Sequence, residues 1–188
     1  DHVWSVVPVC AEYELPAYIH PGDRERLTNP NDFMSPAMRA AILESTGGEL
    51  TTAEPADVRV LADGQAITIA GIELVPMHTP GHTPGSTIFH AGVAGAAREH
   101  LVSGDVLFNN GIGRTDLLGG DPVAMAESLA RLMRAYSDDT LVYPGHGPVT
   151  TIGDERRRSR YLREALAEKY PRADIEPLLA TAGTAGAK

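Results

Sequence analysis

Three histidines and one aspartate form the clearest chemical pattern in the chain. His82 and His146 each complete a Pro-Gly-His sequence, His78 lies four residues before His82, and Asp105 follows an apolar segment through one glycine. Each stands just past an expected strand, where a tight glycine or proline turn can aim a side chain into a cleft. Imidazole nitrogens and carboxylates are donors for zinc, iron and manganese. The pattern therefore predicts a metal site.

Each of these residues also has an ordinary interpretation. A lone histidine is more often a surface or core residue than a ligand, and His20, His90 and His100 are interpreted in that way. Asp105, after a glycine, would equally well cap the next turn. The joint occurrence of two Pro-Gly-His sequences and a Gly-Asp, all at strand ends, favours the metal site over separate structural roles.

Short strands with few helices between them must position these residues. This organisation favours an α/β sandwich over a doubly wound sheet. Turns are expected at Asp63-Gly64 and Ala70-Gly71, between paired strands. The expected strands cover residues 15–20, 58–61, 66–69, 72–75, 86–90, 100–103 and 141–143, and the expected helices cover 3–13, 36–45, 121–136 and 154–170, with a helical turn over 21–26.

The helix after Asp121 has the strongest local signals, with Asp121 as N-cap and Pro122 in the first turn. One apolar stripe is expected to face the core, consisting of Val123, Ala126, Leu129, Leu132, Met133 and Tyr136. The first helix is expected to be buried and to be bent or ended by Pro8, with Cys10 packed inside it. Pro171 is expected to end the last helix, and residues 181–188 to form a disordered tail.

Composition excludes several classes of protein. The chain has 188 residues, 43% of them apolar, which suits one domain with a core, and no apolar run approaches the roughly 20 residues of a membrane span. A net charge of −9 and 5% aromatic residues argue against a binder of nucleic acid or anionic membranes. The single cysteine excludes an intrachain disulfide framework and fits a cytoplasmic protein.

The motifs together resemble the metallo-β-lactamase superfamily, and most closely its glyoxalase II-like (hydroxyacylglutathione hydrolase-like) branch. The resemblance implies an αβ/βα sandwich over residues 1–170, with a tail over 171–188 and with the family's N-terminal strands missing from this chain. The matching pieces occur in the family's order, and they are Asp1-His2, residues 78–86, 103–108, 111–116 and 144–148.

The resemblance also implies a ligand set for two divalent metal ions, zinc in the first instance, with iron or manganese as alternatives. Asp1 and His2 match the end of the family's His-x-His-x-Asp-His motif, so two further histidines are expected upstream of residue 1. The first ion would take those histidines, His82 and Asp105. The second would take Asp1, His2, His146 and the shared Asp105, and His78 would be a neighbour.

The implied reaction is hydrolysis of a small-molecule thioester such as S-lactoylglutathione by metal-bound hydroxide. A thiol leaves easily because its pKa is about 8.5, and Asp1 is a candidate proton donor for a poorer leaving group. Arg114 and Asn109 are expected at the substrate rim, where Asp116 replaces a family aromatic. Arg114 and Asp116 would alternatively form an internal salt bridge, and residues 156–158 a solvated basic face, so glutathione recognition stays open.

Two alternatives remain. A persulfide dioxygenase-like enzyme shares the Gly-Arg-Thr-Asp pattern of residues 113–116 but uses a single iron. A non-catalytic fragment or binding module is the other, because half of the first metal site is absent from residues 1–188.

Overall fold

The computed structural model describes residues 2–3, 5–46 and 54–180. The chain forms two compact units, residues 1–61 and residues 62–188. Of the expected tail over 171–188, residues 181–188 lie outside the described residues, whereas Arg172–Leu179 form a helix. Among the helices of the described ranges, none is long and apolar enough to cross a membrane.

The first unit contains short helices and one pair of strands. Strands β1 (Ala17–Ile19) and β2 (Val58–Val60) pair in parallel, with Ala17 opposite Val58. The helices of this unit are α1 (Val6–Tyr13), η1 (Pro21–Asp23), α2 (Arg24–Thr28), η2 (Pro30–Phe33) and α3 (Pro36–Thr46). The helix expected over 36–45 is therefore present.

The first helix differs from its expectation in two respects. α1 begins at Val6, so Pro8 lies in the first turn, where its missing N–H would have had no helical partner. Pro8 therefore neither bends nor ends the helix. No residue of α1 is buried, and Cys10 is half-buried, so the prediction of a buried helix with Cys10 packed inside was wrong.

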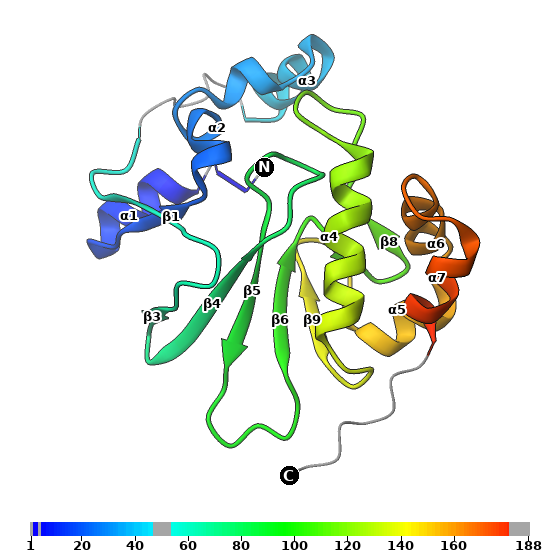
Figure 1. Cartoon of the computed structure of the whole chain (residues 1–188). Coiled ribbons are helices and arrows are strands. Elements are labelled where there is room, and N and C mark those ends of the chain that lie inside the picture. Colours follow the sequence, from blue (N-terminus) through cyan, green and yellow to red (C-terminus); the bar gives the residue numbers. More distant parts are fainter. Residues whose placement is uncertain (1, 4, 47–53, 181–188) are drawn as a thin grey trace. The chain divides into compact units, whose positions relative to one another are not determined.

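The second unit is built on a six-stranded sheet in the order β10-β9-β6-β5-β4-β3 (Figure 1). All neighbouring strands are antiparallel except β6 and β9, which are parallel. The strands are β3 (Ile67–Ile69), β4 (Ile72–His78), β5 (Thr87–Gly92), β6 (His100–Gly104), β9 (Leu141–Pro144) and β10 (Thr150–Thr151), and a separate hairpin consists of β7 (Leu107–Phe108) and β8 (Gly111–Ile112).

Of the two turns expected between paired strands, one joins such a pair and the other does not. Ala70 and Gly71 join β3 to β4 with φ of 50° and 79°, the left-handed pair that suits a two-residue hairpin. Asp63-Gly64 is also a turn, but it does not join paired strands, because β2 pairs with β1.

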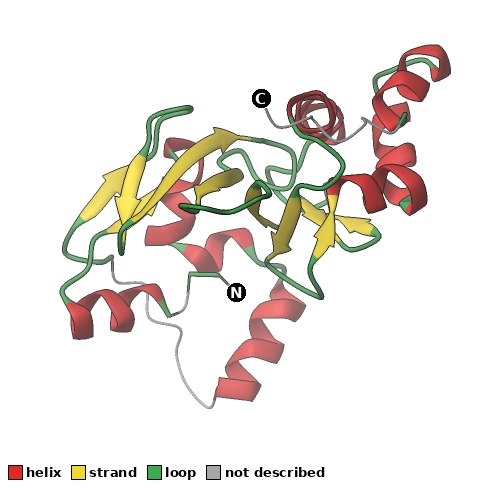
Figure 2. Ribbon diagram, turned by 90° about the horizontal axis from the view of Figure 1, so that it is seen from below, coloured by secondary structure: helices red, strands yellow, loops and turns green. Residues whose placement is uncertain are grey.

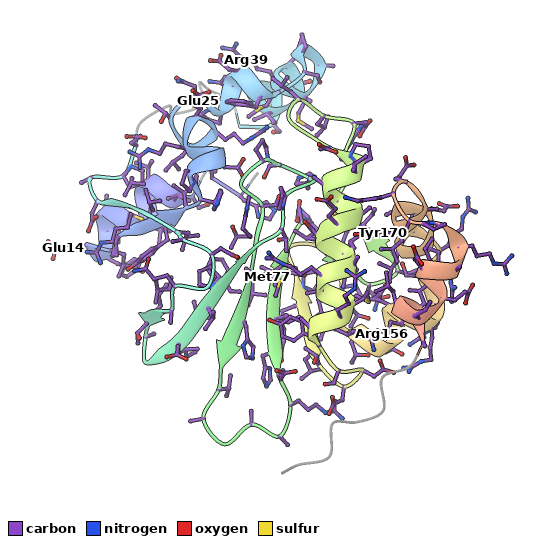
Figure 3. All side chains as sticks on the ribbon, viewed as in Figure 1. Glu14, Glu25, Arg39, Met77, Arg156 and Tyr170 are labelled. Atoms are coloured by element: carbon purple, nitrogen blue, oxygen red, sulfur yellow. The ribbon has the colours of Figure 1, made fainter. Side chains whose placement is uncertain are left out.

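Helix α4 (Pro122–Ala135) runs along one face of the sheet, with α6 (Arg160–Ala167) and α7 (Arg172–Leu179) beside it (Figures 1 and 2). The Asp121 carboxylate accepts hydrogen bonds from the amides of Val123 and Ala124, which confirms the predicted N-cap. The predicted stripe is buried at Ala126, Leu129, Leu132 and Met133, and Tyr136 packs partly against the core, but Val123 is exposed. Met77 of β4 packs against the same core (Figure 3).

The C-terminal region contains three helices where one was expected: α5 (Ile152–Arg158), α6 (Arg160–Ala167) and α7 (Arg172–Leu179). Ser159 breaks the expected helix, since it has extended backbone and its hydroxyl accepts from the Leu162 amide as the N-cap of α6. The prediction that Pro171 ends the last helix was wrong, because α6 already ends at Ala167 and Pro171 is the N-cap of α7. The apolar side of α7 is buried in the core, at Ile175, Leu178 and Leu179.

Arg156 is buried, which corrects the expectation of a solvated basic face over residues 156–158. Its side chain is 2% exposed and pairs with Asp138, and its guanidinium donates to the carbonyls of Met133 and Tyr136 (Figure 3). These carbonyls end α4 and lack partners within the helix. Arg156 therefore caps the helix that covers the sheet.

Replacing Arg156 with alanine should destabilise the protein by about 3 kcal/mol, because Asp138 and two carbonyls would lose their buried partner. Arg158→Ala is the matched control: this residue ion-pairs with Asp154 on the same helix but is 69% exposed. It should cost less than about 1 kcal/mol. Urea unfolding followed by circular dichroism measures both, and equal losses would contradict the capping role.

Candidate metal centre

Three of the predicted ligands converge in the second unit. His146 Nε2 lies 3.4 Å from Asp105 Oδ2, and His82 Nε2 lies 3.8 Å from the same oxygen. The Asp105 side chain is 16% exposed, whereas that of His146 is 54% exposed. Two imidazole nitrogens facing one carboxylate oxygen form a donor set suited to zinc, iron or manganese, so these residues fit a divalent metal.

Asp105 is aimed by an irregularity at the end of β6. The pairing register of β6 and β9 shifts between Val102 and Gly104, and Gly104 takes a left-handed φ of 49°. Other residues adopt this backbone conformation only at a cost. The Gly145 amide donates to the Gly104 carbonyl at 2.8 Å, which ties the segment before Asp105 to the segment before His146.

His146 follows directly from β9 through this Gly145. Its ring meets the Phe108 ring edge to face, with centroids 6.2 Å apart. Phe108 belongs to the β7–β8 hairpin, whose Asn110 amide donates to the Glu155 carboxylate. Burial raises the pKa of Glu155, which also accepts from the Thr150 hydroxyl. The hairpin and the packing of His146 thus depend on a buried carboxylate.

His82 lies on a loop between β4 and β5 that is fixed from several sides. The loop is closed by the Thr79 amide donating to the Ser86 carbonyl at 2.8 Å. Near α4, the Ser128 hydroxyl donates to the Pro80 carbonyl, and the Asp121 amide donates to the Gly81 carbonyl. His82 is therefore held by the helix as well as by the sheet.

The protonation pattern of His82 follows from its partner. His82 Nδ1 lies 2.8 Å from the Arg114 carbonyl oxygen, which can only accept, so Nδ1 carries the proton. In the neutral ring, Nε2 then has a free lone pair on the side of Asp105. Ligating histidines in metalloproteins are held in this way by a second hydrogen bond.

His78 points to a different partner. Its Nε2 lies 2.8 Å from the Pro84 carbonyl oxygen, so Nε2–H donates across the loop that carries His82. Its backbone amide donates to Asp63 Oδ1, and its carbonyl accepts from Arg131. His78 therefore spans the loop that carries His82, and its role as a neighbour rather than a ligand stays a prediction.

The two predicted substrate residues are engaged within the protein. Arg114 and Asp116 form a bidentate salt bridge with distances of 2.7 and 2.6 Å, as the alternative interpretation expected. Hydrogen bonds from the Arg114 guanidinium lower the pKa of Asp116 to about 2, and the Asp116 carboxylate in turn raises the pKa of Arg114. Asn109 donates to the Val149 carbonyl at 3.4 Å. Their contact with a substrate stays a prediction.

Asp1, predicted as both ligand and catalytic residue, lies outside the described residues. His2 is described within the first unit, and its role as a ligand stays a prediction.

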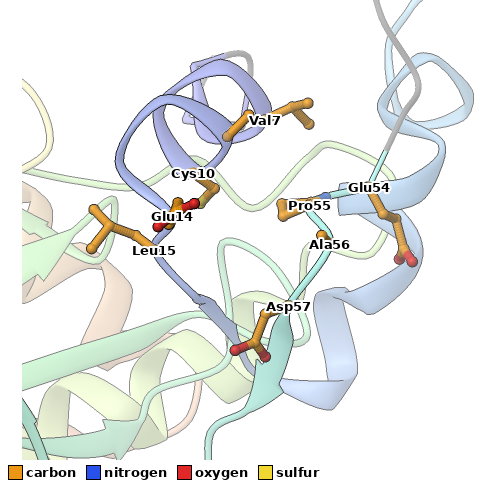
Figure 4. Close-up of a pocket in the computed structure, with 9 residues that line it drawn as sticks. Val7, Cys10, Glu14, Leu15, Glu54, Pro55, Ala56 and Asp57 are labelled. Carbon is orange, nitrogen blue, oxygen red and sulfur yellow. The ribbon is translucent and has the colours of Figure 1, made fainter.

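Cys10 lines a surface hollow of about 490 Å³ in the first unit (Figure 4). Besides Cys10, the hollow is lined by Val7, Ala11, Glu14, Leu15 and residues 54–57. No histidine is among these lining residues, so the predicted ligand set does not extend to this hollow.

Gly113 is a supporting residue that sequence reasoning missed, although it lies in one of the matched motifs. A Cβ at this position would overlap the Asp105 carbonyl oxygen and lie 3.0 Å from Cβ and Cγ of His82. Only glycine lets the 113–114 segment approach both predicted ligands so closely.

Gly113→Ala should therefore weaken metal binding by at least about tenfold, because it displaces two predicted ligands at once. Gly111→Ala is the matched control, since its Cβ would meet Phe108 at an ordinary 3.5 Å. Zinc titration in competition with a chromogenic chelator measures both affinities. Unchanged affinity in Gly113→Ala would contradict this arrangement of the site.

Comparison with known proteins gives consistent results. The chain is 33% identical to a probable metallo-hydrolase, YqgX, of Bacillus subtilis over 162 residues, which cover 86% of this chain and 71% of the relative. It is 37% identical to the hydroxyacylglutathione hydrolase GloC of Haemophilus influenzae over 100 residues, 53% of this chain and 45% of that protein.

A solved structure of TTHA1623 in a di-iron-bound form is similar in fold, with a TM-score of 0.64 and 36% identity over 85% of this chain and 71% of that one. This similarity confirms the predicted α/β fold class. The model of the metallo-beta-lactamase superfamily matches residues 1–146. The chain therefore belongs to the metallo-β-lactamase superfamily.

Proposed function

We propose that the protein is a metal-dependent hydrolase that cleaves a small-molecule thioester. The observation that carries this proposal is the convergence of His82 and His146 on one carboxylate oxygen of Asp105. Membership of a superfamily that includes metallo-hydrolases supports a hydrolytic reaction.

In the proposed ligand set, His82 would hold one ion, His146 with Asp1 and His2 would hold a second, and Asp105 would contribute to both. When bound, divalent ions of this kind lower the pKa of water toward neutrality and polarise a substrate carbonyl. Zinc is the first candidate, and the di-iron form of the similar structure supports iron as the second.

The chain's own residues have separable tasks in this proposal. Asp105 supplies a negative charge from a largely buried position, which offsets the repulsion between two cations. The Arg114 carbonyl keeps the proton of His82 on Nδ1 and so keeps Nε2 available. The His146 side chain is much more exposed than that of Asp105, so we expect a substrate to approach from the side of His146.

The choice of a thioester as substrate rests on the chemistry of the leaving group. A thiolate is a good leaving group near neutral pH, so this reaction needs no proton donor above the leaving atom. GloC, a relative named as a hydroxyacylglutathione hydrolase, supports the same substrate class. Arg114 is already paired with Asp116, so recognition of glutathione carboxylates must depend on other groups or on breaking this pair.

Asp105→Asn should lower metal affinity by at least about 100-fold and abolish hydrolysis of S-lactoylglutathione, because it removes a charge that both ions share. His78→Ala is the matched comparison: it removes the hydrogen bond to the Pro84 carbonyl but no predicted ligand, so metal content should stay near that of the unmodified protein. Elemental analysis and a thioester assay on both variants measure these effects.

Three outcomes would contradict parts of the proposal. Loss of metal in His78→Ala with normal loading in Asp105→Asn would show that the wrong histidine has been assigned. One tightly bound iron per chain with persulfide oxidation would favour the dioxygenase. Full metal loading without hydrolysis of any thioester tested would favour a binding module.

A further inference from the structure

The segment from Gly113 to Asp121 connects the predicted ligands to helix α4. At its beginning, the Gly113 amide donates to the Val106 carbonyl, and Gly113 lies directly against Asp105 and His82. At its end, the Asp121 amide donates to the Gly81 carbonyl, next to His82, while the Asp121 carboxylate caps α4. Both ends of this segment therefore contact His82 or its neighbour Gly81, so a change in the shape of the segment would shift His82.

A change in the shape of this segment would first alter the hydrogen bond between His82 Nδ1 and the Arg114 carbonyl. This hydrogen bond decides which ring nitrogen carries the proton and how the ring is turned, and its oxygen belongs to the peptide unit between residues 114 and 115. The orientation of that peptide unit therefore sets the direction in which His82 Nε2 points.

The Arg114–Asp116 salt bridge spans this peptide unit. Arg114 Nε donates to Asp116 Oδ1 and Nη2 donates to Oδ2, so two parallel hydrogen bonds join the side chains on either side of Thr115. A bidentate contact fixes geometry as well as distance. Both side chains are mostly exposed, at 58% and 67%, so a stabilising role in the core is absent.

We propose that Asp116 is a positioning residue: by clamping Arg114, it holds the Arg114 carbonyl against His82 Nδ1 and so orients His82 for metal binding. This inference rests on the proposed metal centre. It also gives Arg114 a structural task in place of the direct substrate contact expected from the sequence. Exposed ion pairs contribute little free energy, so the effect on affinity should be modest.

The first test uses the metal-free protein at pH 8, with 15N-labelled histidine and NMR detection of the ring nitrogens. In the unmodified protein, His82 should show one tautomer with the proton on Nδ1. In Asp116→Asn and in Arg114→Gln, the signals should shift toward a mixture of tautomers. The double variant should be no further shifted than either single variant, because the two residues act as one unit.

The second test is zinc affinity by chelator competition. Each single variant should bind zinc about fivefold more weakly, the scale expected for an exposed pair. Glu164→Gln is the matched control for Asp116→Asn, because Glu164 accepts from Arg160 at 2.7 Å in an exposed pair on α6 and the charge change is the same. Its tautomers and its zinc affinity should not change.

The outcomes separate this inference from the proposed function. An unchanged His82 tautomer in both single variants, or equal loss of affinity in Glu164→Gln, would overturn the positioning role. A substrate-contact role would instead leave the tautomer and the zinc affinity unchanged in Arg114→Gln and raise only KM. Failure of the unmodified protein to bind any metal would refute the proposed function, while the tautomer measurement would still decide the role of Asp116.

Discussion

Strands β6 and β9 run parallel, so their carboxyl ends lie at the same edge of the sheet, and the Gly145 amide joins these ends by donating to the Gly104 carbonyl. Asp105 and His146 are the residues that directly follow these two glycines. Their separation is therefore set by backbone hydrogen bonding rather than by long flexible side chains. A site that must hold ligands within a few tenths of an ångström gains this precision from rigid elements.

The third donor depends on the helix. His82 is on a loop whose carbonyls accept hydrogen bonds from Ser128, in the middle of α4, and from Asp121, the N-cap of α4. α4 is in turn fixed to the sheet by its buried apolar stripe and is capped at its other end by Arg156. The apolar core and the candidate site are thus coupled, because packing of α4 on the sheet also sets the position of His82.

The chemistry of the site was predictable from the sequence to the extent that it depends on local pattern. Histidines and an aspartate after strands, next to glycine and proline, indicated His82, Asp105 and His146, and the structure brings these three together. The cap at Asp121 was equally local, since an aspartate before proline and an apolar stripe specifies a helix start.

Features that depend on tertiary packing were not predictable in this way. A run of three arginines predicts a solvated face. Only the position of α5 against the end of α4 shows that Arg156 is buried. The helix after Pro171 likewise follows from apolar residues that pack in the core. The break at Ser159 does have a local cause, its capping hydroxyl, but one serine within a helical pattern does not specify a break. The close approach of Gly113 to Asp105 joins two segments that periodicity cannot relate.

The central claim is that Asp105 is shared between His82 and His146 in one metal centre. Anomalous diffraction at the zinc edge, from crystals of the protein grown with zinc, tests it most directly. We expect metal peaks about 2.0–2.2 Å from a carboxylate oxygen of Asp105, with His82 and His146 completing the contacts. Zinc bound to His82 or His146 without Asp105, or bound only at other histidines such as His90, would contradict it.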